Sequence, residues 1–211
     1  MNVFNVRCIR HKVDMLADEH PKTMTDEEYL QSEVLSHVKR EYIDGRVYAM
    51  AGAGPNHNRI SVNISSEFQR HLKGMPCETY MADMKVRSGN DYFYPDVMVD
   101  CASLERIGQF TTSPILIIEV LSKSTRKNDT TIKLMRYINM ESLQEYVLIE
   151  QDSVCVHVLR KTNNWLSEYF YLGDTVTFES IGLSLAVEEI YDRVDNDDMR
   201  EFRQQKQNLP D

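Results

Sequence analysis

The segment ILIIEVLS (residues 115–122) is an unbroken apolar run with one carboxylate, Glu119, in its middle. An apolar run of this length is typical of a strand covered on both faces, so we place it at the centre of a sheet. A second apolar strand, EYVLIE (145–150), follows after a segment of helical spacing that Thr125 can cap. The order strand, helix, strand predicts a right-handed parallel crossover.

Short strands and helices alternate on the N-terminal side of this centre. Thr25 and Glu28 form a capping-box pattern, which predicts a short helix to about residue 32. Asp44–Gly45 lies between two alternating runs in REYIDGRVYAM (40–50) and predicts a hairpin. Apolar residues at helical spacing then predict a long helix over 60–72.

Strands separated by turns are predicted over 78–101, with Pro95 at an edge or a bulge. The residues after 150 indicate an antiparallel meander and then a short helix or turn. We therefore predict an α/β domain with a mixed central sheet flanked by helices. Its expected limits are residues 24–193, between an N-terminal extension (1–23) and a polar, frayed tail (194–211).

Length and composition fit this picture of one globular domain. The chain has 211 residues, of which 42% are hydrophobic and 27% charged. Its apolar runs are strand-sized, and charges interrupt the N-terminus before a signal-peptide core forms. We expect a cytoplasmic protein without membrane association. The four cysteines are widely spaced and form no zinc motif, which indicates reduced, partly buried thiols (Cys8, Cys77, Cys101, Cys155).

Charge is unevenly distributed along the chain, although the net charge is −9. Between residues 122 and 136 there are five basic side chains and one acidic one, whereas residues 188–201 are strongly acidic. The net charge argues against a protein coated in nucleic-acid-binding surface, but the first stretch lies next to Glu119 and is expected to supply phosphate contacts despite the acidic total. The predicted contacts are Lys123, Arg126, Lys127 and Arg136.

Three charged groups stand where charge is costly to keep. Asp96 lies in YFYPDVMVD (92–100), Glu119 lies in the central strand, and Lys133 lies on the helix that follows. A carboxylate among apolar side chains loses much of its hydration unless a cation or a hydrogen-bond network compensates. Two carboxylates and a lysine suit metal-assisted phosphodiester hydrolysis, because Mg²⁺ prefers hard oxygen ligands.

Several short blocks occur together in a specific order: MTDEEYL, EYIDGRVYAMAGAGPNHNRI, YPDVMV, IIEVLSKST, D-x3-K-x3-Y from Asp129 to Tyr137, and EYVLI. Over residues 24–193 the chain resembles the restriction-endonuclease-like PD-(D/E)xK superfamily. The likeness is to its branch of small endonuclease-like proteins known as a domain of unknown function. The resemblance implies a metal-dependent endonuclease with a restriction-endonuclease-like core.

The resemblance implies that Asp96 and Glu119 bind the metal, together with the main-chain carbonyl of Val120. The superfamily's lysine normally follows the glutamate by two residues, but Leu121 occupies that position here. Lys133 matches the helical lysine that replaces it in this branch. Three further residues match the branch. The resemblance implies that Glu41 aids a metal-bound water or a second ion, that His57 contacts the substrate, and that Tyr137 supports the site next to Lys133.

Simpler structural roles compete with these assignments. Asp96 can cap a turn, Glu41 can pair across the hairpin with Arg46, and His57 can cap its helix or donate to the backbone. Lys133 can be a solvated lysine beside a core tyrosine. The aromatic run at 169–171 favours core packing over base stacking.

The expected reaction is DNA hydrolysis by an activated water with Mg²⁺, or Mn²⁺ in its place, and without an organic cofactor. A homodimer would provide one site for each strand. Two other classes stay open. One is a catalytically inactive module of the same fold that binds nucleic acid or protein, and the other is a phosphodiesterase that acts on RNA or small phosphates.

Overall fold

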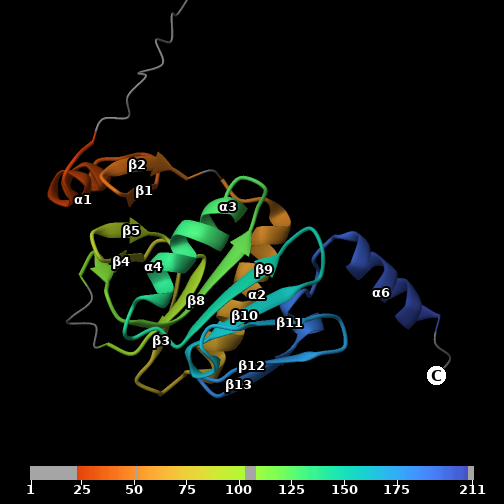
Figure 1. Cartoon of the computed structure of the whole chain (residues 1–211). Coiled ribbons are helices and arrows are strands. Elements are labelled where there is room, and N and C mark those ends of the chain that lie inside the picture. The colour runs from red at the N-terminus through yellow and green to blue at the C-terminus, as the bar shows by residue number, and fades with distance from the viewer. Residues whose placement is uncertain (1–22, 51, 103–107, 209–211) are drawn as a thin grey trace, which may run out of the picture.

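The computed structural model describes residues 23–50, 52–102 and 108–208 (Figure 1). The predicted extension, apart from residue 23, and Cys8 lie outside the described residues. In the described part of the chain no helix combines the length and the apolar character that crossing a membrane requires.

A six-stranded mixed sheet forms the centre of the molecule (Figure 1). Its strand order is β11-β10-β9-β8-β6-β3. The bounds are β3 Glu78–Met81, β6 Val97–Asp100, β8 Pro114–Leu121, β9 Glu145–Glu150, β10 Val156–Arg160 and β11 Ser167–Phe170. Strands β8 and β9 are parallel and the other pairs are antiparallel. The predicted central position of 115–122 and its parallel pairing with 145–150 are confirmed.

Both faces of β8 are buried, as its apolar sequence requires. Leu116, Ile118 and Val120 belong to one core, in which α2 (Pro55–His71) covers the sheet. Ile117 and Leu121 belong to a second core on the opposite face. Glu119 shares the parity of this second pair, so its carboxylate projects into the face that α4 (Leu134–Ile138) covers.

The predicted helix at Thr25 and the predicted hairpin are both present. Helix α1 spans Asp26–Val34 with a complete capping box, and β1 (Arg40–Ile43) pairs with β2 (Arg46–Ala49). Asp44 and Gly45 both have positive φ, as a two-residue hairpin turn requires.

A second, five-stranded sheet was not predicted. Its order is β2-β1-β5-β4-β7, with β4 Lys85–Ser88, β5 Asp91–Phe93 and β7 Phe110–Thr111. Phe93 and Val86 from this sheet join Tyr137 of α4 in the second core. Pro95 lies in the connection between β5 and β6, where the chain passes from one sheet to the other. Pro95 was predicted at an edge or a bulge; it lies outside both strands, where no ladder hydrogen bond is needed.

The helix after β8 is irregular. A short α3 (Arg126–Asn128) leads into a π-helical turn over Asp129–Lys133 and then into α4. The prediction that Thr125 caps this helix is wrong, because its side chain makes no capping bond and instead contacts Ser122. Single π-helical turns inside α-helices occur frequently at functional sites.

The predicted meander is only partly correct. Strands β10 and β11 extend the central sheet, but β12 (Thr175–Phe178) and β13 (Leu183–Ala186) form a separate hairpin that joins the first core. The short helix α5 (Val187–Ile190) follows β13, and a 3₁₀ turn (Lys161–Asn163) follows β10. The hairpin can leave the sheet because Val176 and Phe178 alternate with exposed threonines and pack on α2.

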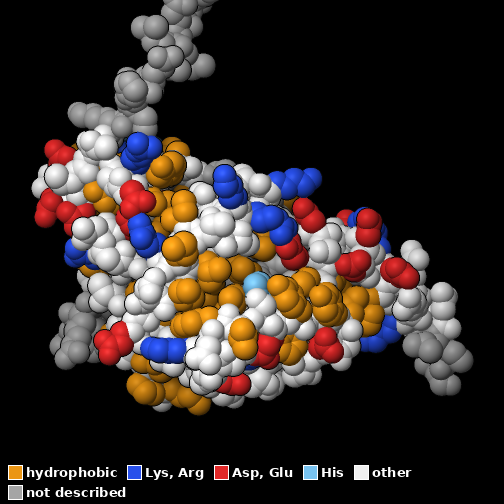
Figure 2. All heavy atoms as spheres, viewed as in Figure 1, with side chains coloured by type: hydrophobic (Ala, Val, Ile, Leu, Met, Phe, Trp, Pro, Cys, Tyr) orange, Lys and Arg blue, Asp and Glu red, His pale blue; other side chains and the backbone are white. Residues whose placement is uncertain are grey.

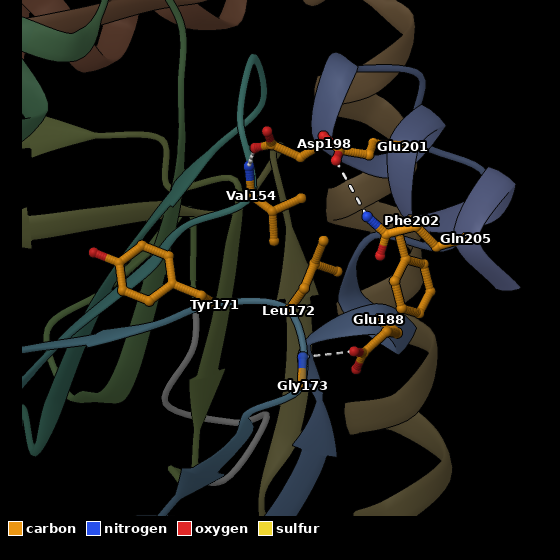
Figure 3. A pocket seen from close by; sticks show the side chains of 9 residues that line it. All are labelled: Val154, Tyr171, Leu172, Gly173, Glu188, Asp198, Glu201, Phe202 and Gln205. Atoms are coloured by element: carbon orange, nitrogen blue, oxygen red, sulfur yellow. Dashed lines mark hydrogen bonds between the residues drawn. The ribbon is translucent and has the colours of Figure 1, made fainter.

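The prediction of a frayed C-terminal tail is wrong for α6 (Asp197–Gln207). Asn196 caps this helix, and Met199 and Phe202 pack on the first core. Figure 3 shows Phe202 beside a cavity of about 530 Å³, where Asp198 accepts a hydrogen bond from the Val154 main chain at 2.6 Å. The polar composition concealed an amphipathic helix whose apolar residues are three positions apart.

The prediction of reduced cysteines is wrong for two of the four. Cys77, before β3, forms a disulfide with Cys101, after β6. These strands are antiparallel neighbours with Glu78 opposite Asp100, so the pairing places both cysteines at the same end of the strand pair. Cys155 is free and half-buried. Wide spacing in sequence did not reveal this proximity, because the β3–β6 pairing creates it.

Candidate active site

A cavity of about 400 Å³ lies where the C-terminal end of β8, the first turn of α2 and the π-helical turn meet. The predicted residues on its wall are His57, Asp96, Glu119 and Lys133. Strand β6 begins immediately after Asp96, and its antiparallel register with β8 brings Asp96 opposite Glu119. Residues that are 23 positions apart in the chain therefore share one cavity.

Asp96 is held through a single oxygen atom. Its Oδ2 accepts a hydrogen bond from the Val120 main-chain N–H at 2.7 Å and lies 3.1 Å from His57 Nε2. Within the described residues, no side chain or main-chain group hydrogen-bonds its Oδ1. Because N–H and C=O of one strand residue point to the same side, the Val120 carbonyl is on the same side of β8 as the N–H that Asp96 accepts.

Glu119 is 3% exposed, and its Oε1 accepts hydrogen bonds from Lys133 Nζ at 3.1 Å and Tyr137 Oη at 3.2 Å. No described residue hydrogen-bonds its Oε2. Burial raises the pKa of Glu119 well above its ordinary value; Lys133 opposes this shift, and the nearby carboxylates, above all Asp129, add to it. Burial likewise raises the pKa of Tyr137, so its hydroxyl remains a proton donor to Glu119.

Lys133 is 3% exposed, and its ammonium lies among three carboxylates. Nζ is 2.9 Å from Glu41 Oε1, 3.1 Å from Glu119 Oε1 and 3.2 Å from Asp129 Oδ1. Burial alone would lower the pKa of Lys133, but the three carboxylates outweigh it and raise the pKa well above its ordinary value. The two upward shifts differ in their main cause, which is burial at Glu119 and the surrounding carboxylates at Lys133.

Leu121 occupies the position, two residues after Glu119, where the superfamily usually has its lysine, but Lys133 supplies an ammonium group to the site. Its side chain packs in the second core, while Lys133 reaches Glu119 from the helix that covers that face. The alternative that Lys133 is solvated is therefore wrong.

Glu41 contacts Lys133 and accepts the Tyr94 N–H at 3.3 Å, whereas Arg46 is exposed and pairs in register with Ile43. The cross-hairpin alternative for Glu41 is wrong as well.

The predicted substrate contacts divide into two groups. His57 lines the cavity, and Lys123 and Lys127 are exposed in the same segment as the wall residues Ser122, Ser124 and Thr125. Arg126 is exposed too, but both of its terminal nitrogens bond to the Glu150 carboxylate. Figure 2 shows Lys and Arg side chains over α3, with Asp and Glu gathered toward α6. Arg136 lies elsewhere and binds Asp91 at 2.5 Å and Asp44 at 2.6 Å.

Sequence reasoning assigned no role to Asp129, which the structure places in this cluster. It is 1% exposed and lies four residues before Lys133. The D-x3-K spacing was visible in the sequence, but this spacing is common on solvated helix surfaces. Only the burial of Asp129 and Lys133, at the two ends of the π-helical turn, distinguishes them from such a surface pair.

The oxygen donors fit a magnesium or manganese ion, although the described residues contain no preformed group of three or more His, Cys, Asp or Glu ligands. Magnesium needs only one or two carboxylates and keeps several waters. In the carboxylates of Asp96 and Glu119, Oδ1 and Oε2 have no described hydrogen-bond donor, whereas Oδ2 and Oε1 are engaged. These residues would hold the ion, with the Val120 carbonyl as a further oxygen donor.

A second buried glutamate on the neighbouring strand shows what a fully satisfied carboxylate looks like. Glu145 accepts hydrogen bonds from Arg160 Nε at 3.1 Å and from the main-chain N–H groups of Glu179 and Ser180 at 3.1 and 2.8 Å. It is 1% exposed, and both of its oxygen atoms are used. Its surroundings therefore identify a structural ion pair, in contrast to the half-used carboxylate of Glu119.

This contrast predicts different stability effects for two substitutions of the same kind. Glu145→Gln should lower the free energy of unfolding by about 3 kcal/mol, because it removes the charge of a buried carboxylate that accepts hydrogen bonds from Arg160, Glu179 and Ser180. Glu119→Gln should lower it by less than about 1 kcal/mol, or raise it, because it relieves repulsion among carboxylates. Urea denaturation of both variants without metal measures the difference. Equal losses would show that Glu119 is also a structural residue.

Comparison with solved structures defines the class of fold. A crystal structure of a protein from Anabaena variabilis ATCC 29413, described as a putative nuclease belonging to DUF820, matches with a TM-score of 0.67. The match covers 80% of this chain and 97% of that one at 21% identity, so it shows the fold. The predicted restriction-endonuclease-like fold is confirmed.

Residues 26–188 match the Uma2 family, described as "Putative restriction endonuclease", and the chain belongs to this family. Two relatives come from Synechocystis sp. (strain ATCC 27184 / PCC 6803 / Kazusa). The protein slr1290 is 40% identical over 173 residues, which cover 80% of this chain and 91% of the relative. The protein sll1609 is 36% identical over 152 residues, which cover 69% and 86%. Family and fold together indicate a nuclease-like protein that acts on nucleic acid.

Proposed function

We propose that this chain is a metal-dependent endonuclease that hydrolyses DNA phosphodiester bonds with water as the nucleophile. The single observation that carries the proposal is the pairing of Asp96 and Glu119 across β6 and β8. Each carboxylate is held through one oxygen atom, and no described donor occupies the other. Two half-used carboxylates in one cavity suit a hard divalent cation.

In this proposal each residue has a distinct role. When bound, a divalent cation supplies Lewis acidity to a phosphoryl oxygen and to water. Tyr137 and Lys133 hold Glu119, and the Val120 N–H and His57 hold Asp96, so both carboxylates are oriented before substrate arrives. Lys133 also stabilises the negative charge that develops on phosphorus oxygens, as a preorganised cation at a water-poor site can.

The direct test of this function is incubation of the purified chain with supercoiled plasmid, single-stranded DNA and RNA in Mg²⁺, Mn²⁺ and EDTA. The proposal expects cleavage of DNA in either metal and none in EDTA. Cleavage of RNA alone would support the phosphodiesterase alternative. Metal binding without cleavage of any substrate would support the inactive binding module.

Lys123 and Lys127 are expected to supply phosphate contacts at the rim of the cavity. Replacing both with Ala should reduce the slope of log affinity against log salt by about 2, because each neutralised phosphate contributes roughly 0.9. Arg126→Ala should change the slope less, since Glu150 already engages its guanidinium. DNA binding at several salt concentrations measures these slopes.

Lys73→Ala is the matched control for this measurement. Lys73 is exposed and follows α2 at its C-terminal end, whereas the cavity lies at the first turn of that helix. If Lys73→Ala lowers the slope as much as the rim variant does, the nucleic-acid surface lies elsewhere.

A further inference from the structure

We propose that Asp129 is a positioning residue, which holds the Lys133 ammonium in place beside Glu119 and Glu41. The inference rests on the proposed nuclease function. It gives a role to a residue that the D-x3-K-x3-Y motif and the wall of the cavity do not explain on their own. Asp129 acts through Lys133 and does not itself contact metal or substrate.

The first observation is an unpartnered buried carboxylate. Asp129 is 1% exposed, and neither Oδ1 nor Oδ2 forms a hydrogen bond with any described group. Its one close charged contact among the described residues is Lys133 Nζ, 3.2 Å from Oδ1. A buried carboxylate without hydrogen bonds costs several kcal/mol, so its retention in the cluster needs a reason other than stability.

The second observation separates positioning from metal binding. Asp129 lies in the wall of the cavity, but each of its carboxylate oxygen atoms exposes less than 1 Å² to solvent. Asp96 and Glu119 differ, because the carboxylate oxygen that each leaves unbonded is not fully buried. A ligand must face the ion, whereas a residue that acts on Lys133 need only face the ammonium.

The π-helical turn provides the means of holding the pair. Asp129 begins the turn and Lys133 ends it, so both side chains enter the cluster from one short segment. Tyr146, buried in β9, donates its hydroxyl to the Asp129 main-chain carbonyl at 2.9 Å. The turn is thereby tied to the central sheet, which fixes where the Lys133 stem begins.

Donor counting shows why this position matters. An ammonium has three N–H donors, and carboxylates of Glu41, Glu119 and Asp129 lie within 3.2 Å of Nζ. Of the three, only Glu119 Oε1 accepts a hydrogen bond from Nζ among the described residues, so Lys133 can turn another N–H to a phosphate or a water without breaking that bond. Asp129 is the partner that it can release without disturbing Glu119, and its charge then draws the ammonium back. This assigns to Asp129 an effect on turnover and not on substrate affinity.

The test is a double-mutant cycle of Asp129→Asn and Lys133→Met in the full-length chain. Asp129→Asn alone should lower kcat about 10- to 100-fold, as loss of an orienting residue typically does, with KM for DNA within about twofold. In the Lys133→Met background the same change should alter kcat less than about twofold. Additive effects, or a change confined to KM, would overturn the inference.

Two further measurements keep the test independent of cleavage. Calorimetric Mn²⁺ affinity of Asp129→Asn should stay within about fivefold of wild type, whereas loss of a ligand would lower it far more. Asp129→Asn should raise the thermal midpoint of Lys133→Met by at least about 3 °C, because it removes one uncompensated buried charge. No such rescue would show that Asp129 does not act on Lys133.

Asp152→Asn is the matched control, since Asp152 is exposed in the turn between β9 and β10 and its loss removes the same charge. It should leave kcat, metal affinity and the thermal midpoint unchanged.

If the wild type cleaves no nucleic acid, the proposed function fails and the catalytic role of Asp129 fails with it. The stability cycle then decides alone whether Asp129 holds Lys133. If the wild type cleaves and the cycle is additive, only the inference fails.

Discussion

Glu119→Gln and Asp96→Asn are each expected to abolish metal-dependent DNA cleavage, by at least about 10³-fold, while the chain stays folded. Each substitution removes one charge from the pair that would hold the cation, with almost no change in volume. In Glu119→Gln, the amide oxygen can still accept the Lys133 and Tyr137 hydrogen bonds that Glu119 Oε1 accepts in the wild type. The effect should therefore fall on cleavage and not on folding.

Cleavage rates in Mg²⁺ and Mn²⁺, measured beside circular dichroism of the same preparations, test this expectation. A variant that loses both activity and its folded spectrum would leave Glu119 as a structural residue. A variant that keeps more than about a tenth of the wild-type rate would show that the cation is held elsewhere.

Lys133→Ala is expected to lower turnover by at least about a hundredfold, within the range for loss of one preorganised electrostatic donor. It should spare metal binding, because Lys133 contacts the oxygen of Glu119 that does not face the proposed ion. The same change should lower the free energy of unfolding by about 3 to 5 kcal/mol, because it leaves three carboxylates without their shared cation.

Single-turnover kinetics, Mn²⁺ calorimetry and urea denaturation separate the three effects of this substitution. Lys85→Ala serves as a control, since this partly desolvated lysine donates to Tyr94 and lies outside the carboxylate cluster. Unchanged turnover in Lys133→Ala would reduce Lys133 to a structural counter-ion of the buried carboxylates.

Local patterns predicted the elements that position the candidate site. The apolar run around Glu119, the strand after Asp96 and the helix carrying Lys133 all appear where the sequence indicated. These elements are set by periodicity and turn chemistry, which act over a few residues. Their meeting in one cavity follows from the antiparallel β6–β8 register and the parallel β8–β9 crossover.

Features that depend on distant contacts could not be predicted in the same way. Arg136 shares a basic stretch with Lys127, but the fold directs it to Asp91 and Asp44 and away from the cavity. Asp129 looks like an ordinary surface partner of Lys133 until the π-helical turn buries both. In each case the decisive partner comes from another part of the chain, which charge patterning along the sequence does not reveal.

Helix α6 is a different case, because its signals were present in the sequence. Asn196 is a favoured N-cap residue, two aspartates occupy the first turn, and Met199 and Phe202 lie three residues apart. The polar composition of 194–211 outweighed these signals in the prediction. A short amphipathic helix needs only a few apolar contacts with an existing core to be retained.

Calorimetric titration of the metal-free protein with Mn²⁺ tests the central claim that Asp96 and Glu119 form a metal site. The account predicts measurable binding to the wild type, binding weakened at least about a hundredfold in Glu119→Gln and in Asp96→Asn, and wild-type affinity in Lys133→Ala. Equal Mn²⁺ affinity in the wild type and in both carboxylate variants would contradict it.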